Sequence, residues 1–569
     1  MVNEGLSFRF QRRLAAVAAS LSLLLVLLVL QLVRWHVLAH PDTIPAPVPV
    51  SLGEPQRARG NIVDRHGQLL ATDVFRWDIG VSPNALKDAD QEKLAQELAP
   101  LLKQSADELL AKIRAQPQAR YVLLASAVDQ EVGERIASLR HPGVKAEPRP
   151  RRYYPQNELA AHLLGFVNVE GRAFYGVEEF YQEFLTNAST LYDSQGGDDT
   201  LPADFSPFIP SPVGRDLILT IDSGIQYLVQ TELRHAIEYY GAQAGTIIVL
   251  DPRTGEILAA ASEPAFDPNR YYEGNDRSWV NSAISLAYEP GSVVKVVTLA
   301  AGLDAQAITL DETFRDNGRL EIGGYEIKNS DRRAHGIVTL TDILAQSLNV
   351  GAAQVSLKLG PEAFYRYLRD FGFGQVTEVD LAGESAGIVK NPNSPVWSES
   401  DLATNAYGQG LTVTPLQLAT AVAAIANDGV LMKPHVVRAT VDQGRLIPIR
   451  PKAQQRAVSA ETARAVSQLM RDATARGIDA DLVPGYQVAG KTGTAQVPTL
   501  TGYSEDTTIA TYVAFLPVDD PRVVILVKLD RPTRSTWAAE VTVPVFQRIA
   551  IELVRLLNIP PDTVRLSRK

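Results

Sequence analysis

The sequence predicts an α+β protein in which an antiparallel five-stranded sheet is covered by helices, preceded by a single transmembrane helix and an elongated α+β N-terminal domain. Two β-branched runs within 246–263 are joined by a Pro-Arg-Thr-Gly turn, which predicts a hairpin. Three more strand-like runs lie within 486–529, and a helical pattern follows at 543–557. Strands, a helical block, more strands and a last helix are typical of an antiparallel sheet covered by helices.

A chain of 569 residues is too long for one compact core, so two or more domains are expected. Between 186 and 214 the composition changes to Ser, Gly, Asp and Pro, which bury too little apolar surface to form a core. We therefore predict five segments: a cytoplasmic tail at 1–13, a transmembrane anchor at 14–36, an N-terminal domain at 37–185, a linker at 186–214 and a C-terminal domain at 215–569.

The run at 14–33 carries no charge and is about as long as a helix needs to cross a bilayer, roughly 20 residues. Because Arg9, Arg12 and Arg13 precede it, the N-terminus is predicted to lie in the cytoplasm and the remainder outside, in an extracellular or periplasmic space. The alternative is a signal peptide cleaved near Ala39, although the apolar run exceeds the usual h-region of about 7 to 15 residues. We expect a single-pass protein of the cell membrane.

The N-terminal domain is predicted to be mixed. At 85–140 Leu and Ala recur at helical spacing among charges, which predicts a pair of partly exposed helices. Gly60 and Gly67 bracket a short strand-like run. His162 lies in an apolar helical stretch, so we interpret it as a packed residue rather than a catalytic one.

Composition excludes several classes of function. A net charge of −10 disfavours a nucleic-acid partner, because such proteins usually carry a basic surplus. The absence of cysteine removes thiolate catalysis, disulfides and cysteine metal sites, and no His/Asp/Glu cluster has metal-ligand spacing. We therefore expect a mechanism with no metal and no cofactor.

Three short motifs follow one another in the C-terminal domain. The first stands at a predicted helix start after Pro-Gly, the second in the helical block and the third on a predicted edge strand: Ser292-Val-Val-Lys295, Ser347-Leu-Asn349 and Lys491-Thr-Gly493. The first two patterns each occur by chance on the order of once or twice in a chain of this length. The order and the contexts are therefore more informative than any single match.

The spacing of the first motif predicts a serine nucleophile beside an amine base. Residues i and i+3 share one face of a helix, so the amine of Lys295 is expected beside the hydroxyl of Ser292. Burial and the second cation, Lys491, would lower the pKa of Lys295 from about 10.4, so that a neutral amine can take the serine proton. The backbone N–H groups of Ser292 and Thr494 are expected to form an oxyanion hole.

Each motif also has an ordinary interpretation. Lys295 could be a solvated helix residue, Ser347 and Asn349 polar residues between helix and loop, and Lys-Thr-Gly a strand that enters a turn. For a single motif this interpretation is as good as the functional one. However, Lys295 interrupts the otherwise apolar VVKVVTLAAGL, where burying a lysine without a role is costly. The three motifs together favour a serine acyltransferase site.

These motifs, in this order, resemble those of the class B penicillin-binding proteins, and the resemblance runs from the predicted anchor to about Leu557. RGNIVDRHGQLLA is similar to the family's N-terminal signature, RYYPQNELAAHLLGFVN and GVEEFY to junction motifs of its pedestal domain, and YGQGLTVTPLQLA to the segment ahead of the last motif. The resemblance implies the penicillin-binding transpeptidase fold, which serine β-lactamases share, behind a pedestal domain of the dimerisation type. It also implies a peptidoglycan D,D-transpeptidase that β-lactams inhibit.

The resemblance assigns a role to each residue of the motifs. Ser292 would be acylated by the D-Ala-D-Ala end of a stem peptide, or by a β-lactam, with Lys295 as its general base. Ser347 would relay the proton toward the leaving group, and Asn349 would hold an amide of the substrate. The residues implied to bind the terminal carboxylate belong to the last motif: Lys491, Thr492, Gly493 and Thr494.

GFVNVEG and KTGTAQ are more similar to the septal, FtsI-type division enzymes than to the elongation enzymes. The implied partners are then an FtsW-like glycosyltransferase of the shape, elongation, division and sporulation family, other divisome proteins and the membrane. An elongation-type transpeptidase and a catalytically dispensable division scaffold or β-lactam-binding protein stay open. A β-lactamase or carboxypeptidase would share the motifs, but it does not need a membrane-tethered domain of roughly 150 residues.

Overall fold

The computed structural model describes residues 59–186, 215–442, 445–499 and 502–567. The predicted tail and anchor, and the predicted linker from residue 187 on, lie outside these ranges. In the ranges described, no helix combines the length and the hydropathy that crossing a bilayer requires. The chain divides into two compact units, Met1–Gln56 and Arg57–Lys569, and the described residues all belong to the second.

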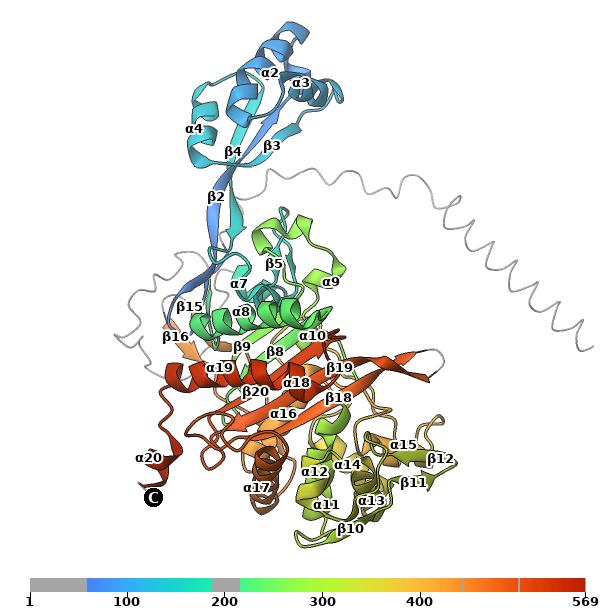
Figure 1. Cartoon of the computed structure of the whole chain (residues 1–569). Helices are drawn as coiled ribbons and strands as arrows, with labels where there is room; N and C mark the ends of the chain where they lie inside the picture. The colour runs from blue at the N-terminus through green and yellow to red at the C-terminus, as the bar shows by residue number, and fades with distance from the viewer. Residues whose placement is uncertain (1–58, 187–214, 443–444, 500–501, 568–569) are drawn as a thin grey trace, which may run out of the picture. The chain divides into compact units, whose positions relative to one another are not determined.

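The predicted five-stranded antiparallel sheet is confirmed (Figure 1). Its strands run in the order β18-β19-β20-β8-β9, and each pair of neighbours is antiparallel. All five runs that the sequence predicted as strands are present: β8 (Ala244–Leu250), β9 (Ile257–Glu263), β18 (Ala489–Thr499), β19 (Gly502–Leu516) and β20 (Val523–Asp530). Since β18 pairs on one side only among the described strands, the Lys-Thr-Gly motif lies on an edge strand, as predicted.

Helices α8 (Ser223–Tyr240) and α19 (Val543–Leu556) cover one face of this sheet (Figure 1). The Asp222 side chain caps α8 by accepting the N–H groups of Gly224 and Ile225. Apolar residues of both helices recur at three- and four-residue spacing and are buried: Ile225, Val229, Leu233, Phe546, Ile549 and Leu553. Each helix therefore buries one apolar stripe against the strands.

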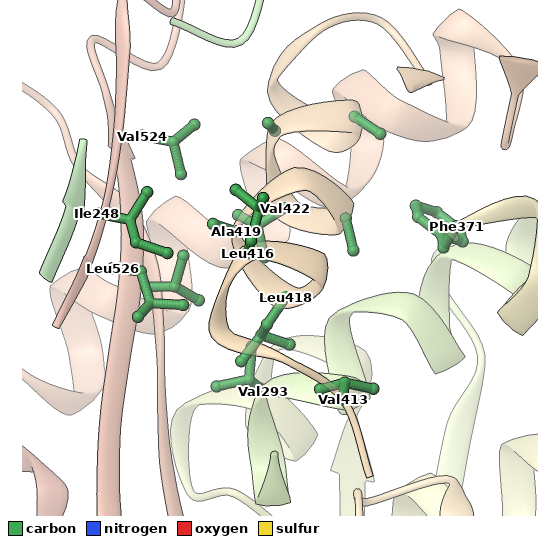
Figure 2. Packing of buried hydrophobic residues seen from close by; sticks show 14 of the residues in the cluster. Ile248, Val293, Phe371, Val413, Leu416, Leu418, Ala419, Val422, Val524 and Leu526 are labelled. Atoms are coloured by element: carbon green, nitrogen blue, oxygen red, sulfur yellow. The ribbon is translucent and has the colours of Figure 1, made fainter. Parts of the chain in front are cut away.

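On the opposite face lies α16 (Pro415–Ala426), a helix with every residue buried. In Figure 2 its residues Leu416 and Val422 lie toward Ile248, Val524 and Leu526 of the sheet. A helix that is apolar all round must have neighbours on every side. The helices α10 (Ser282–Ser285), α11 (Lys295–Asp304) and α17 (Ala460–Gly477) supply them. The other helices of this half are α12 (Leu340–Ala345), α13 (Asn349–Leu359), α14 (Pro361–Asp370) and α15 (Glu399–Asn405).

Three two-stranded sheets lie within this helical half: β10 (Thr313–Asp316) with β13 (Gly336–Thr339), β11 (Arg319–Ile322) with β12 (Tyr325–Lys328), and β14 (Val430–Met432) with β17 (Ala453–Arg456). The short elements elsewhere in the C-terminal part are η3 (Pro268–Glu273), α9 (Asp276–Trp279), η4 (Gly291–Val294), α18 (Ala538–Val541) and α20 (Asp562–Leu566). Of these, η4 and α18 border the residues of the three motifs.

In the N-terminal part, the interval 85–140 is only partly the pair of helices that the sequence predicts. Helices α2 (Asp88–Leu102) and α3 (Ala106–Arg114) are present, but they are followed by a strand, β3 (Val122–Val128), and by α4 (Gln130–Ser138). β3 pairs with β2 (Leu69–Val81), which also pairs with β4 (Val144–Tyr153). VLLASAV, with Leu, Ala and Ser at five of its seven positions, has weak strand propensity, and pairing with β2 overrides it.

A second sheet joins the N-terminal and C-terminal parts of the chain. β1 (Ile62–Val63) pairs with β2 and, in parallel, with β7 (Asp216–Leu219). The sheet continues through β15 (Val437–Asp442) to β16 (Arg445–Pro448). The small elements beside it are η2 (Pro83–Ala85), α5 (Ala161–Leu164), β5 (Phe166–Val167), β6 (Ala173–Phe174), α6 (Gly176–Phe180) and α7 (Gln182–Thr186). His162 in α5 is buried, as predicted, and burial lowers its pKa to about 4.

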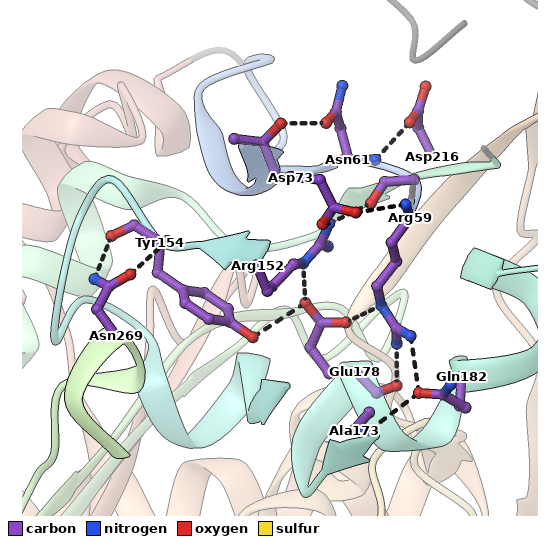
Figure 3. A network of polar contacts seen from close by, with 12 residues as sticks. Arg59, Asn61, Asp73, Arg152, Tyr154, Ala173, Glu178, Gln182, Asp216 and Asn269 are labelled. Atoms are coloured by element: carbon purple, nitrogen blue, oxygen red, sulfur yellow. Dashed lines mark hydrogen bonds and ion pairs between the residues drawn. The ribbon is translucent and has the colours of Figure 1, made fainter. Parts of the chain in front are cut away.

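A buried ionic network joins α6 to strands β2 and β4 and to the segment just before β1 (Figure 3). The Glu178 carboxylate receives the Nε–H of Arg59 at 2.5 Å and the Nε–H of Arg152 at 2.6 Å. Arg152 also pairs with Asp73 at 3.1 Å. Burial alone would raise the pKa of Glu178, but the two guanidinium groups lower it below its usual value. Removing one member of such a buried network typically costs about 3 to 5 kcal/mol of stability.

Candidate active site

Ser292 lies in the 3₁₀ turn η4, which leads directly into α11. The preceding Gly291 has φ +57°, a left-handed conformation that glycine adopts without strain. The serine is partly exposed, whereas Lys295, one turn later, is fully buried. The predicted helix start after Pro-Gly is therefore confirmed.

Two further glycines allow backbones to meet around the serine turn. A Cβ on Gly408 would lie 2.1 Å from the carbonyl oxygen of Gly291, and a Cβ on Gly493 would lie 2.7 Å from that of Pro290. The Gly408 carbonyl accepts the N–H of Gly291 at 3.2 Å. The YGQG segment and the edge strand β18 therefore clamp the turn that carries Ser292, which explains why these positions need glycine.

Ser347 and Asn349 lie between α12 and the start of α13, and they hold the Lys295 amine. Lys295 Nζ donates to the Ser347 carbonyl oxygen at 2.5 Å, to Asn349 Oδ1 at 2.8 Å and to Ser347 Oγ at 3.3 Å. Ser347 has φ +57°, a strained conformation for a non-glycine residue. The first two motifs therefore meet, as the sequence predicts.

One detail differs from the expectation. The Ser292 hydroxyl makes no hydrogen bond to Lys295 among the described residues, because the Lys295 amine is engaged by Ser347 and Asn349 instead. Asn349 is itself oriented by donating its Nδ2–H to the carbonyl oxygen of Lys328 at 2.9 Å. One N–H and one lone pair of the Asn349 amide are left for a ligand.

The third motif reaches the same point. Lys491 Nζ donates to Ser347 Oγ at 3.1 Å and to the carbonyl oxygen of Thr492 at 3.0 Å. The Thr494 hydroxyl accepts the N–H of Ala538 at the start of α18, at 3.1 Å, and keeps its own proton to donate. Ser347 Oγ thus lies between two lysine amines, one from each of the other motifs.

Both lysines are buried, and burial changes their acidity. Burial lowers the pKa of Lys295 well below its ordinary value, and the nearby charge of Lys491 lowers it further. Burial also lowers the pKa of Lys491, to about 7. A neutral amine is therefore accessible near neutral pH, which is the property that a general base needs.

Glu289, Tyr407 and Tyr503 also belong to this site, although the sequence analysis did not single them out. Glu289 Oε1 accepts the N–H of Gly410 and the hydroxyl of Tyr503, each at 3.0 Å. Burial raises the pKa of Glu289. Its place three residues before Ser292 was a usable signal, but nothing in the spacing pointed to Tyr503, which is 214 residues away along the chain.

The described residues contain no group of three or more His, Cys, Asp or Glu side chains arranged to hold a metal ion. The chemistry that they offer is acid–base chemistry. It consists of a hydroxyl at a helix start, two amines with lowered pKa and a second hydroxyl between these amines. This arrangement suits acyl transfer through a serine ester.

Comparison with known proteins decides the family. Residues 245–550 match the penicillin binding protein transpeptidase domain, and residues 55–188 match the penicillin-binding protein dimerisation domain. The chain belongs to the penicillin-binding protein transpeptidases. It is an FtsI-like, class B member of this family and a serine-type D,D-transpeptidase.

Relatives of this transpeptidase align over most of its length. It is 35% identical to penicillin-binding protein PbpB of Mycobacterium tuberculosis, over 89% of this chain and 79% of the relative. It is 31% identical to peptidoglycan D,D-transpeptidase FtsI of Escherichia coli, over 90% of this chain and 86% of the relative. A crystal structure of penicillin binding protein 3 from Mycobacterium tuberculosis, complexed with aztreonam, matches with a TM-score of 0.68 and 30% identity, over 89% of this chain and 98% of that one.

Proposed function

We propose that this penicillin-binding transpeptidase crosslinks peptidoglycan stem peptides through an acyl-enzyme on Ser292, and that it does so in septal wall synthesis. One observation carries the catalytic part of this proposal. Two buried lysine amines, Lys295 and Lys491, meet at the hydroxyl of Ser347, and Lys295 lies three residues after Ser292. Two cations would be costly to bury together without a function.

In the first step Lys295 acts as the general base. A neutral lysine amine has two N–H groups and one lone pair. The two N–H groups match its two shortest contacts, to the Ser347 carbonyl oxygen and to Asn349 Oδ1. The lone pair is then left to take the proton of Ser292 as its oxygen attacks the carbonyl carbon of the D-Ala-D-Ala bond.

Ser347 and Lys491 complete the transfer. The Ser347 hydroxyl lies within hydrogen-bond distance of both lysines, so it can pass the proton from Lys295 toward the amine of the departing D-Ala. Lys491, with Thr492, Gly493 and Thr494, is proposed to bind the terminal carboxylate. Asn349 is proposed to hold a substrate amide with its remaining N–H and lone pair. A β-lactam would acylate the same serine.

The cellular part of the proposal rests on likeness. The septal role is supported by the similarity to FtsI-type enzymes, and the membrane location by the uncharged run at 14–33 with arginines before it. An FtsW-like glycosyltransferase is the proposed partner. Stage V sporulation protein D of Bacillus subtilis is 30% identical over 91% of this chain, so a role in sporulation is the second candidate.

The full chain in detergent is treated with a fluorescent penicillin and separated on a gel. We expect a stable fluorescent band that Ser292→Ala abolishes. Rapid loss of the label by hydrolysis would point to a β-lactamase instead.

The cellular role is tested in cells. Cells that keep dividing and crosslinking with Ser292→Ala as their only copy would favour a scaffold. Normal septa with defective elongation after depletion would refute the septal role.

A further inference from the structure

Glu289 presents a carboxylate beside the nucleophile that the proposed acylation does not use. Its Oε1 accepts the N–H of Gly410 and the hydroxyl of Tyr503. Its Oε2 is buried and has no hydrogen-bond partner among the described residues. A buried carboxylate oxygen is costly when it is left unpaired. This oxygen therefore suits a donor that the protein itself does not supply.

One tyrosine contacts this carboxylate, and a second lies in the segment that binds it. Tyr503 in β19 donates its hydroxyl to Glu289 Oε1. Tyr407 directly precedes Gly408, whose carbonyl oxygen accepts the N–H of Gly291, and the N–H of Gly410 in the same segment binds Glu289. A carboxylate beside aromatic rings suits an ammonium group.

The charges around Glu289 favour a cation. Burial raises the pKa of Glu289, and the hydrogen bonds from Gly410 and Tyr503, together with the charge of Lys390, oppose this rise. Lys390 itself is paired with Asp401, at 3.0 Å. Among the described residues no cation forms an ion pair with Glu289, so its charge is open to a cationic ligand. The substrate groups that Lys491 suits are anionic, whereas those that Glu289 suits are cationic.

We propose that Glu289 binds the ammonium group of the acceptor strand, with Tyr407 and Tyr503 beside it. This assignment rests on the proposed transpeptidation, which ends when a primary amine attacks the Ser292 ester. The ammonium donates to Oε2, while Gly410 and Tyr503 stay on Oε1. Glu289 therefore decides whether the acyl group passes to an amine or to water.

In this step Glu289 takes a proton from the acceptor, and the Ser292 ester becomes an amide. The acceptor arrives as R–NH₃⁺ and gives one proton to the Glu289 carboxylate. The neutral amine attacks the ester carbonyl, the C–N bond forms and the bond from carbon to Ser292 Oγ breaks. The second amine proton passes through Lys295 to Ser292 Oγ. Glu289 then releases its proton to solvent, and the products are an amide and the free serine.

The test separates the two half-reactions in the full-length protein. The donor is a thioester analogue of an acyl-D-Ala-D-Ala peptide and the acceptor is D-alanine, with aminolysis and hydrolysis products counted by mass spectrometry. Glu289→Gln keeps the shape of the side chain and removes its charge. We expect the ratio of aminolysis to hydrolysis to fall roughly 10- to 100-fold, the usual worth of a charge-assisted hydrogen bond. Glu362→Gln, on the exposed first turn of α14, is the matched control.

Acylation by fluorescent penicillin is measured on the same variants. An unchanged ratio in Glu289→Gln, or a parallel fall of acylation and aminolysis, would overturn the inference and leave a structural role. Failure of the wild type to be acylated would instead refute the proposed function. Tyr503→Phe provides a second test: without the hydroxyl on Oε1, the carboxylate keeps more negative charge for the ammonium, so the D-alanine concentration needed for half-maximal aminolysis should fall. An unchanged or higher requirement contradicts an ammonium site on this carboxylate.

Discussion

Replacing Lys491 by alanine is expected to shift the pH dependence of Ser292 acylation upward. Lys491 Nζ and Lys295 Nζ are hydrogen-bonded to the same oxygen, Ser347 Oγ, at 3.1 and 3.3 Å. Two charges roughly 5 to 6 Å apart repel each other by about 3 kcal/mol at an effective dielectric constant of ~20, which equals about 2 pKa units.

The direction follows from the form of Lys295 that reacts. Its neutral amine is the base, and the positive charge of Lys491 favours that form by lowering the pKa of Lys295. Without this charge the pKa rises, so the base is protonated at a higher pH. Because Lys491 itself has a pKa of about 7, its charge acts fully only below neutral pH. We therefore expect the acidic limb of the pH profile of Ser292 acylation to move up by about 1 to 2 pH units.

The assay is the second-order rate constant for acylation by a fluorescent penicillin, measured from pH 5 to 10. The position of the limb is the readout, because the amplitude also falls when Lys491 no longer binds the carboxylate. Lys491→Arg is the matched control, since a guanidinium stays charged throughout this range. A limb that stays in place in Lys491→Ala, or that shifts equally in both variants, refutes the electrostatic coupling.

Two further substitutions test the scaffold of the site. In Gly408→Ala the new Cβ meets the Gly291 carbonyl oxygen at 2.1 Å and the residue keeps φ +83°, so we expect a loss of about 2 kcal/mol or more in thermal unfolding and at least ~10-fold slower acylation. Gly324→Ala is the control: its φ is +77° but the space around it is open, so the substitution costs only backbone strain and acylation should be normal. Glu178→Gln leaves two buried arginines without their carboxylate, and we expect a loss of about 3 to 5 kcal/mol in urea unfolding. A loss of unfolding free energy below about 1 kcal/mol would contradict this, since it would mean that the network contributes no more than a surface ion pair.

The elements with a strong hydrophobic pattern were predictable from the sequence. The five strands of the central sheet and the helices α8 and α19 follow from their period and their length. The strand β3 was not predictable, because VLLASAV has no strong alternation and depends on its pairing with β2. The local sequence pattern thus does not predict a strand that forms only through pairing with a distant strand.

The candidate site was predictable as three motifs, but not as a set of contacts. Spacing along one helix suggested that Lys295 faces Ser292, yet the amine is held by Ser347, whose positive φ no sequence pattern reveals. The contact between Glu289 and Tyr503 joins positions 214 residues apart, and only the folded chain brings them together. Burial of the two lysines, which lowers their pKa, is likewise a property of the packed interior.

Ser292 is the residue proposed to carry the acyl group. Trypsin cuts after Arg277 and Lys295, so the serine lies in the peptide 278–295, which also contains three other serines. After treatment of the full chain with penicillin, we predict that the mass of this peptide increases by that of one penicillin and that fragment ions assign the addition to Ser292. An unmodified peptide, or an addition on another serine that Ser292→Ala does not abolish, would contradict the account.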